Sequence, residues 1–132
     1  MLTAAECVGA AQRVLELVVE HLLVRTQFGR PLGSFQALRH RVADLTVTLE
    51  AARSTTWYAA SRPDDFPVVA PLSRALASDA FVTVAGEAIQ LFGGIGFTWE
   101  HQAHLYFKRA WSTALATDST TLKALAFERS GS

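Results

Sequence analysis

Arg25-Thr-Gln-Phe-Gly-Arg-Pro-Leu-Gly-Ser-Phe-Gln36 interrupts a long helical pattern and is followed at once by a second one. Three of its residues break the first helix and turn the chain: Gly29, Pro31 and Gly33. Glycine tolerates a positive φ angle, and proline lacks the N–H donor that a continuing helix needs. The stretch therefore predicts a bend between two helices.

The bend gathers Arg25, Gln27 and Gln36 near the N-terminus of the second helix. A guanidinium group and two amides beside backbone N–H groups suit an anionic ligand that accepts many hydrogen bonds, such as a diphosphate. A structural role is the simpler interpretation of these residues alone. Arg25 then caps the last carbonyl groups of its own helix, and the two glutamines are solvated.

Apolar residues recur at steps of three and four on both sides of the bend, which predicts amphipathic helices. We expect the first helix to end near residue 24 and the second to begin near Ser34, a suitable N-cap. A linker at residues 61–67 precedes a third helix from about Pro67 to Phe92. Its many alanines let other helices approach closely, so we expect it to be the central helix, with Pro71 in its first turn.

Gly93-Gly94-Ile95-Gly96 ends the third helix. A fourth helix is expected from Thr98 to about Trp111, and Asp118 or Ser119 caps a short last helix. No strand pattern with a period of two appears in the sequence. The sequence therefore predicts an all-α fold, an up-and-down four-helix bundle with a short additional helix.

The chain has 132 residues, which fits a single domain spanning residues 1–132. Twelve basic and twelve acidic residues cancel, and without a basic block we expect no nucleic-acid partner. Glu16, Glu20 and Arg25 interrupt the best apolar run, so we expect no membrane span. Cys7 cannot form an internal disulfide and indicates a reducing, cytoplasmic setting, where it serves as a small buried residue.

The glycine run lacks the context of a nucleotide-binding loop, because no strand precedes it and no Gly-Lys-Ser or Gly-Lys-Thr follows it. A helix end and a turn are its simplest role. His101 and His104 lie three residues apart on one helical face, a spacing that a metal ion can use. No third ligand lies nearby in the sequence, so we predict no metal site.

Two motifs together resemble those of a known family. Arg25-x-Gln-Phe-Gly-x-Pro-Leu-x-x-Phe-Gln36, continuing as His40-Arg-Val-Ala-Asp44, resembles the signature that opens the C-terminal helical domain of the acyl-CoA dehydrogenases. Gln90-Leu-Phe-Gly-Gly-Ile-Gly-Phe-Thr98 resembles the glycine-rich loop of that family, at the family's usual distance. The family's N-terminal helical domain and middle β-domain have no counterpart here. We therefore expect an isolated C-terminal portion, either a piece of a longer protein or a natural short subunit.

The resemblance implies that this domain binds FAD jointly with a β-domain, with many of its contacts made across a dimer interface. The chain would then belong to a homo- or hetero-oligomer that contacts acyl-CoA in the complete enzyme. The residues implied to contact the cofactor are Arg25, Phe28 and Gln36 from the first motif, and Gln90, Leu91, Phe92, Gly93 and Gly94 from the glycine loop.

The family's reaction is α,β-dehydrogenation of an acyl thioester, in which a carboxylate removes the α-proton and the β-hydride passes to the flavin. The family position of that carboxylate falls on Thr117, whose hydroxyl has far too high a pKa to act as base. Asp118 is a weaker candidate, one residue later. Two explanations are favoured over it: a base on a segment that precedes Met1, or a non-catalytic partner subunit of the kind found in the heteromeric enzymes of bacterial steroid catabolism.

The resemblance therefore implies the C-terminal domain of an FAD-dependent acyl-CoA dehydrogenase, inactive on its own. Phe-Thr-Trp-Glu-His101 and His104-Leu-Tyr-Phe-Lys-Arg-Ala110 look most like the bacterial steroid-catabolism subgroup. An alternative from another class is a helical oligomerisation module or partner subunit without a flavin role. In that alternative, the broad apolar faces of the first and third helices pair subunits.

Overall fold

The computed structural model of the chain describes residues 1–24, 26–27, 29–31, 35–92 and 97–131. These residues form five α-helices and one pair of very short strands, which confirms the predicted all-α bundle with a short additional helix. In chain order, the elements are α1 (Leu2–Val24), β1 (Thr26–Gln27), β2 (Arg30–Pro31), α2 (Gln36–Ser61), α3 (Phe66–Phe92), α4 (Phe97–Leu115) and α5 (Ser119–Ser130).

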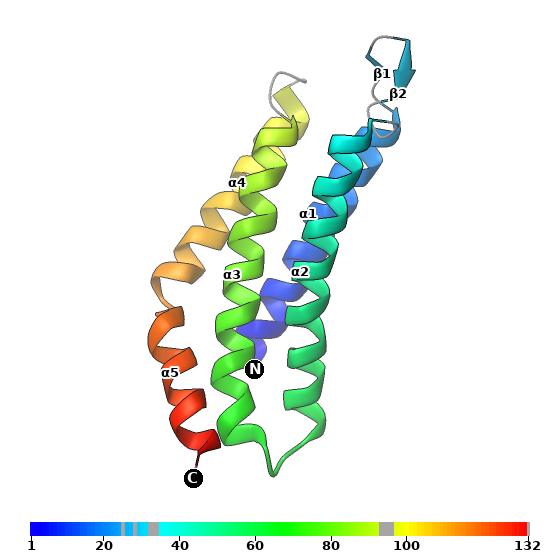
Figure 1. Cartoon of the computed structure of the whole chain (residues 1–132). Coiled ribbons are helices and arrows are strands. Elements are labelled where there is room, and N and C mark those ends of the chain that lie inside the picture. The colour runs from blue at the N-terminus through cyan, green and yellow to red at the C-terminus, as the bar shows by residue number, and fades with distance from the viewer. Residues whose placement is uncertain (25, 28, 32–34, 93–96, 132) are drawn as a thin grey trace.

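The helices run alternately up and down, and α5 continues in the direction of α4 along the other half of α3 (Figure 1). This order places the end of α1, the two strands, the start of α2, the end of α3 and the start of α4 at one end of the bundle. We call this the hairpin end. Both motifs singled out in the sequence flank helices that meet there.

The central helix is α3, which packs against α1, α2, α4 and α5 (Figure 1). Its small side chains allow this, because each removes bulk between two helix axes, as expected from the sequence. Those fully buried on α3 are Ser73, Ala75, Ala77, Ser78, Ala80, Ala85 and Ala88. The large side chains of Phe81 and Phe92 fill the space that the small ones leave.

Helix α3 is also long and apolar enough to cross a membrane, by its length and composition. The apolar run of the first helix is interrupted by Glu16 and Glu20, whereas α3 carries its three charges far enough apart to be a candidate span. The fold accounts for this composition, because a helix surrounded by four others is apolar on all sides.

The two strands were not expected. They pair in antiparallel fashion, with Thr26 opposite Pro31 and Gln27 opposite Arg30. Gly29 turns the chain between them at a φ of 77°, a conformation that glycine adopts without strain. Strands of two residues are too short to show an alternating pattern, so no periodicity in the sequence predicts them.

Helix α2 begins at Gln36, slightly later than expected. Phe35 is its N-cap residue, with φ −78° and ψ 127°, and makes no side-chain hydrogen bond to the first turn. Ser34, the expected cap, lies outside the described residues. The first backbone N–H groups of α2 therefore receive no acceptor from their N-cap side chain.

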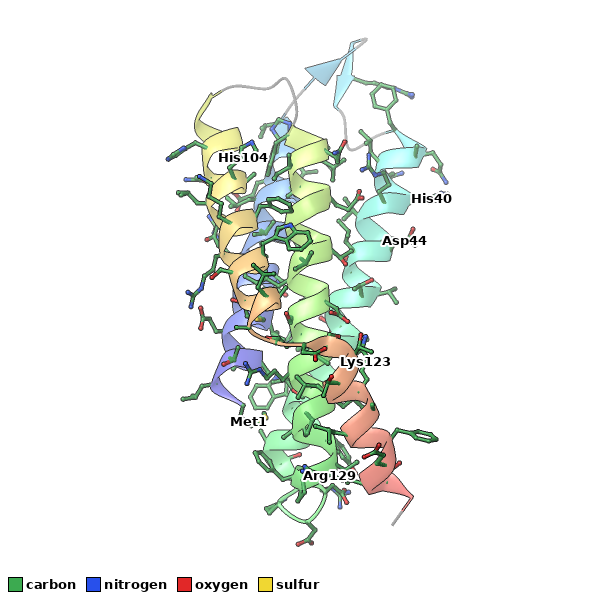
Figure 2. The ribbon with its side chains drawn as sticks, turned by 90° about the vertical axis from the view of Figure 1, so that its left-hand side faces the viewer. Met1, His40, Asp44, His104, Lys123 and Arg129 are labelled. Atoms are coloured by element: carbon green, nitrogen blue, oxygen red, sulfur yellow. The ribbon has the colours of Figure 1, made fainter. Side chains whose placement is uncertain are left out.

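Pro71 lies inside α3, five residues after its first residue Phe66, so the expected place in the first turn is wrong. A proline at this position leaves the carbonyl group of Pro67 without its usual helical donor. Arg129 of α5 supplies the missing donor, since its Nη1 lies 2.7 Å from Pro67 O. Figure 2 shows Arg129 at the end of the bundle where α3 begins. A contact from the last helix thus accommodates the proline.

Candidate functional site

The hairpin end holds the described residues of both motifs. Arg30, Phe35, Gln36 and His40 come from β2 and from the start of α2, and Gln90 comes from the last turns of α3. Four residues implied as cofactor contacts lie outside the described residues: Arg25, Phe28, Gly93 and Gly94. For these four, the assignment stays a prediction.

Gln36 is exposed on the first turn of α2 and contacts one neighbour on its own helix. Its Nε2 lies 3.0 Å from Nε2 of His40, one helical turn later. Figure 2 shows His40 on the outer side of α2, next to the hairpin. The amide of Gln36 is thus both accessible to a ligand and held by a side chain.

Arg30 lies over the ring of Phe35, with Cζ 4.1 Å from the ring centroid. The electron-rich face of the ring attracts the guanidinium group and restricts its freedom. Because Phe35 directly precedes Gln36, this contact brings a positive charge close to the first turn of α2. Sequence reasoning gave Arg30 no role.

The three described residues of the glycine-loop motif differ in exposure. Gln90 is exposed, whereas Leu91 and Phe92 are 7% and 1% exposed and belong to the core. Phe92 packs edge to face against His21 of α1, with ring centroids 5.3 Å apart. The side chains of Leu91 and Phe92 therefore anchor the end of α3, which leaves their backbone atoms for any contact with a cofactor.

Thr117, at the position where the family resemblance places the base, is 2% exposed. Its hydroxyl donates to the carbonyl oxygen of Thr113 at 2.7 Å, and its backbone N–H donates to Ala114 O at 3.0 Å. Thr117 therefore closes the end of α4. Nothing in this arrangement can remove a proton from a substrate carbon.

Asp118 is the N-cap of α5, as expected from the sequence. Its carboxylate accepts hydrogen bonds from the hydroxyl of Thr121 at 2.5 Å and from the backbone N–H of Thr121 at 3.3 Å. Both bonds favour the ionised form and lower the pKa of the carboxyl below its usual value. A lowered pKa makes a poorer general base, so the structure gives Asp118 a capping role.

Cys7 is buried, which confirms its expected place in the core. Burial, followed by the negative charge of Glu6, raises the pKa of its thiol, and the nucleophilic thiolate is disfavoured. His101 and His104 are exposed on α4. Over the described part of the chain, no three His, Cys, Asp or Glu side chains gather in a group that could hold a metal ion.

Two side-chain pairs at or near the hairpin end were missed by sequence reasoning. The spacing of four between Gln36 and His40 was a usable signal, because such residues are neighbours on a helix surface. The ion pair between Arg41 of α2 and Glu87 of α3 had no such signal, since it joins residues far apart in sequence. Arg41 thus joins two helices of its own chain while its side chain stays 41% exposed.

Comparison with known proteins agrees with this architecture. The family described as "Acyl-CoA dehydrogenase, C-terminal domain" matches residues 1–118. Acyl-CoA dehydrogenase IpdE2 of Mycobacterium tuberculosis is 54% identical over 119 residues, which cover 90% of this chain and 37% of that protein. The chain thus spans little more than a third of the length of this relative.

Solved structures share the fold. Butyryl-CoA dehydrogenase from Megasphaera elsdenii aligns with a TM-score of 0.84 and 31% identity, over 95% of this chain and 34% of that one. A structure described as an FAD-dependent dehydrogenase aligns with a TM-score of 0.87 and 32% identity, over 97% of this chain and 36% of that one. The chain therefore belongs to the acyl-CoA dehydrogenase family, in which it matches the C-terminal domain.

Proposed function

We propose that this chain is the flavin-binding C-terminal part of an FAD-dependent acyl-CoA dehydrogenase, an oxidoreductase that introduces an α,β double bond into an acyl-CoA thioester. In this role it contributes FAD contacts and subunit contacts, and it is inactive alone. The proposal includes an acyl-CoA substrate for the complete enzyme, partner subunits in a homo- or hetero-oligomer, and a cytoplasmic location. The similarity to IpdE2 proteins from two mycobacterial species supports the steroid-catabolism subgroup.

One observation carries the proposal: helices that adjoin the two motifs meet at the hairpin end, and each supplies an exposed glutamine there. Gln36 starts α2 and Gln90 lies in the last turns of α3, 54 residues later in the sequence. The up-and-down topology brings them to the same end of the bundle. We expect a ligand as long as a dinucleotide to contact both.

The groups at this end fit FAD by their chemistry. Its diphosphate is an anion that only accepts hydrogen bonds, and α2 offers amide N–H groups and first-turn backbone N–H groups that its N-cap side chain does not engage. Arg30 adds a positive charge beside them. When bound, FAD supplies the acceptor for the β-hydride of the substrate.

The described residues offer no suitable base near the family position, because Thr117 closes α4 and Asp118 caps α5. We propose that the α-proton is removed by a carboxylate outside this chain. That carboxylate lies either on a preceding segment of the same enzyme or in a catalytic partner subunit. In both cases, the roles of Thr117 and Asp118 are structural, at the end of α4 and at the start of α5.

The alternative of an oligomerisation module receives less support. It needs apolar faces of α1 and α3 for pairing subunits, yet α3 already packs against four helices of its own chain. Contacts with other polypeptides remain part of the proposal, since large apolar side chains on other helices face outward. Trp57 on α2, Leu115 on α4 and Phe127 on α5 are 68%, 82% and 80% exposed.

The test is the FAD content of the complete enzyme after Gln36→Ala and Gln90→Ala, alone and together. We expect each change to weaken FAD binding while the oligomer keeps its size. Gln12→Ala is the matched control, because Gln12 also pairs with the residue four positions later but lies in the middle of α1. Full FAD content in the double variant would refute the proposal, and altered oligomer size with retained FAD would support the module.

A second test uses the chain by itself. We expect the purified chain to be colourless and to reduce no dye with any acyl-CoA, because half of the flavin site and the base lie outside it. Turnover by the chain alone would refute this part of the proposal.

A further inference from the structure

We propose that His40 is a positioning residue for the cofactor: its imidazole fixes the amide of Gln36 so that a hydrogen-bond donor faces the diphosphate. This inference rests on the proposed function, because it takes Gln36 to be a flavin contact. Nothing in the sequence motifs themselves gives His40 this task.

The geometry defines which atom donates. Nε2 of Gln36 carries two hydrogens and no lone pair available for accepting, so at 3.0 Å from Nε2 of His40 it must donate. In this geometry Nε2 of His40 is the acceptor, which corresponds to the tautomer with its ring proton on Nδ1.

The hydrogen bond has a consequence for the other atoms of the Gln36 amide. A glutamine side chain rotates almost freely about its last torsion, and a flipped amide would present its carbonyl oxygen where its nitrogen had been. His40 accepts one N–H and so fixes which side of the amide carries nitrogen. The second N–H stays available, and a diphosphate, which only accepts, needs such a donor.

Fixing the amide in advance also lowers the entropic cost of binding. An exposed glutamine loses rotamer freedom when a ligand orders it, and part of that loss has already occurred in the Gln36 and His40 pair. The neighbouring Arg41 does not compete for this role, because it pairs with Glu87 of α3. Arg30, stacked on Phe35, supplies a positive charge near the Gln36 amide, and His40 sets the orientation of that amide.

The experiment is an NMR titration of the chain with FAD, which detects binding even when it is weak. Four chains are compared with the unchanged one: H40L, H40Q, Q36A and Q36A/H40L. We expect H40L to weaken FAD binding about fivefold, the effect of one ordinary hydrogen bond. H40Q should restore most of the affinity, because its new side chain again offers an acceptor one turn after Gln36.

The double variant separates positioning from direct contact. If His40 acts through Gln36, H40L has no further effect on FAD binding once Gln36 is alanine. The ¹⁵N shifts of the His40 ring give a second readout: we expect the Nδ1–H tautomer in the unchanged chain and a mixture in Q36A. E16L, which breaks the comparable Gln12 and Glu16 pair on α1, is the matched control and should leave FAD binding unchanged.

The outcomes distinguish this inference from the proposed function. Unchanged FAD affinity in H40L, together with weakened binding in Q36A, would overturn the positioning role and leave the flavin site intact. Equal losses in H40L with and without Gln36 would also overturn it. If FAD shifts no resonance near Gln36 in the unchanged chain, the proposed function of the site fails, and the role of His40 fails with it. Thermal melting of each variant verifies that the bundle is folded. If H40L does not fold, the comparison of H40Q with the unchanged chain keeps the test decisive.

Discussion

The hydroxyl oxygens of Thr56 in α2 and Ser73 in α3 lie 3.0 Å apart and form a hydrogen bond inside the bundle, where Ser73 has no exposed surface. Thr56 Oγ1 also lies 2.8 Å from Ala52 O, one turn back on its own helix. Since a hydroxyl has one proton, Thr56 donates to Ala52 and accepts from Ser73. The two helices are therefore linked inside the bundle by a short chain of hydrogen bonds, in addition to the ion pair between Arg41 and Glu87.

This arrangement predicts unequal costs for the two partners. Thr56→Val keeps the shape but leaves the buried donor of Ser73 without its acceptor, and we expect a loss of about 1 to 2 kcal/mol in the free energy of unfolding. Ser73→Ala leaves Thr56 bonded to Ala52 and should cost less than about 1 kcal/mol. Urea denaturation of both variants measures the difference.

The double variant T56V/S73A is the control. Once the buried donor is removed, the loss caused by Thr56→Val should largely disappear, because no hydroxyl is left unsatisfied. Additive losses in the double variant would contradict the assigned direction of the hydrogen bond.

Arg129 and Pro71 give a second prediction. Arg129→Ala removes the side-chain donor to Pro67 O, and should lower the free energy of unfolding by about 1 kcal/mol. Pro71→Ala restores a backbone N–H that can reach the same carbonyl group. In that background, we expect Arg129→Ala to cost little.

Thermal melting of the four chains in this cycle measures the coupling. Pro71→Ala alone should stabilise the bundle, since proline in a helix interior is unfavourable. An unchanged cost of Arg129→Ala in both backgrounds would mean that Arg129 acts elsewhere.

The sequence predicted the helices well where the periodic pattern was long. Leu45, Leu49 and Ala52 follow the spacing of three and four on α2, and all three are buried. The alanines of α3 correctly predicted a central helix, because small side chains admit neighbours whichever fold they belong to. The cap of the last helix was narrowed to Asp118 or Ser119, since capping depends only on residues within one turn, and the structure shows that it is Asp118.

What the sequence could not show depends on residues brought together by the fold. The donor for Pro67 O comes from Arg129, 62 positions away, and no local sequence pattern predicts this contact. Leu91 and Phe92 stand within a cofactor motif, yet their side chains are used by the core, and only packing reveals this. The orientation of the Gln36 amide depends on a ring tautomer, which the sequence does not specify.

Asp118 gives a prediction about pH. Hydrogen bonds from the side chain and the backbone N–H of Thr121 lower the pKa of Asp118 below the usual 3.8 in the folded chain. Its contribution to stability is therefore present above the pKa of the unfolded chain and is lost as the pH falls through the lower, folded value. Asp118→Asn keeps a capping side chain without a charge. We therefore expect the melting temperature of this variant to fall less than that of the unchanged chain between neutral and acidic pH.

The same residue tests the assignment of the base. Asp118→Ala should lower the melting temperature at neutral pH because α5 loses its cap, while turnover of the complete enzyme, measured well below the melting temperature, stays unchanged. Loss of turnover in Asp118→Asn, with the melting temperature preserved, would instead make Asp118 the base.

Gln90 and Phe92 stand two positions apart and should separate ligand contact from packing. Phe92 is 1% exposed and touches His21, so Phe92→Ala should lower the free energy of unfolding by about 3 to 4 kcal/mol through the cavity it creates. Gln90 is exposed, and Gln90→Ala should change stability by less than about 0.5 kcal/mol while weakening FAD binding in the complete enzyme. Urea denaturation and FAD titration of both variants measure the two effects.

Phe92→Leu is the matched control, because it keeps most of the buried volume and should cost much less than Phe92→Ala. A Phe92→Ala variant as stable as the unchanged chain would contradict the core role of this residue, and normal FAD affinity in Gln90→Ala would remove Gln90 from the cofactor site.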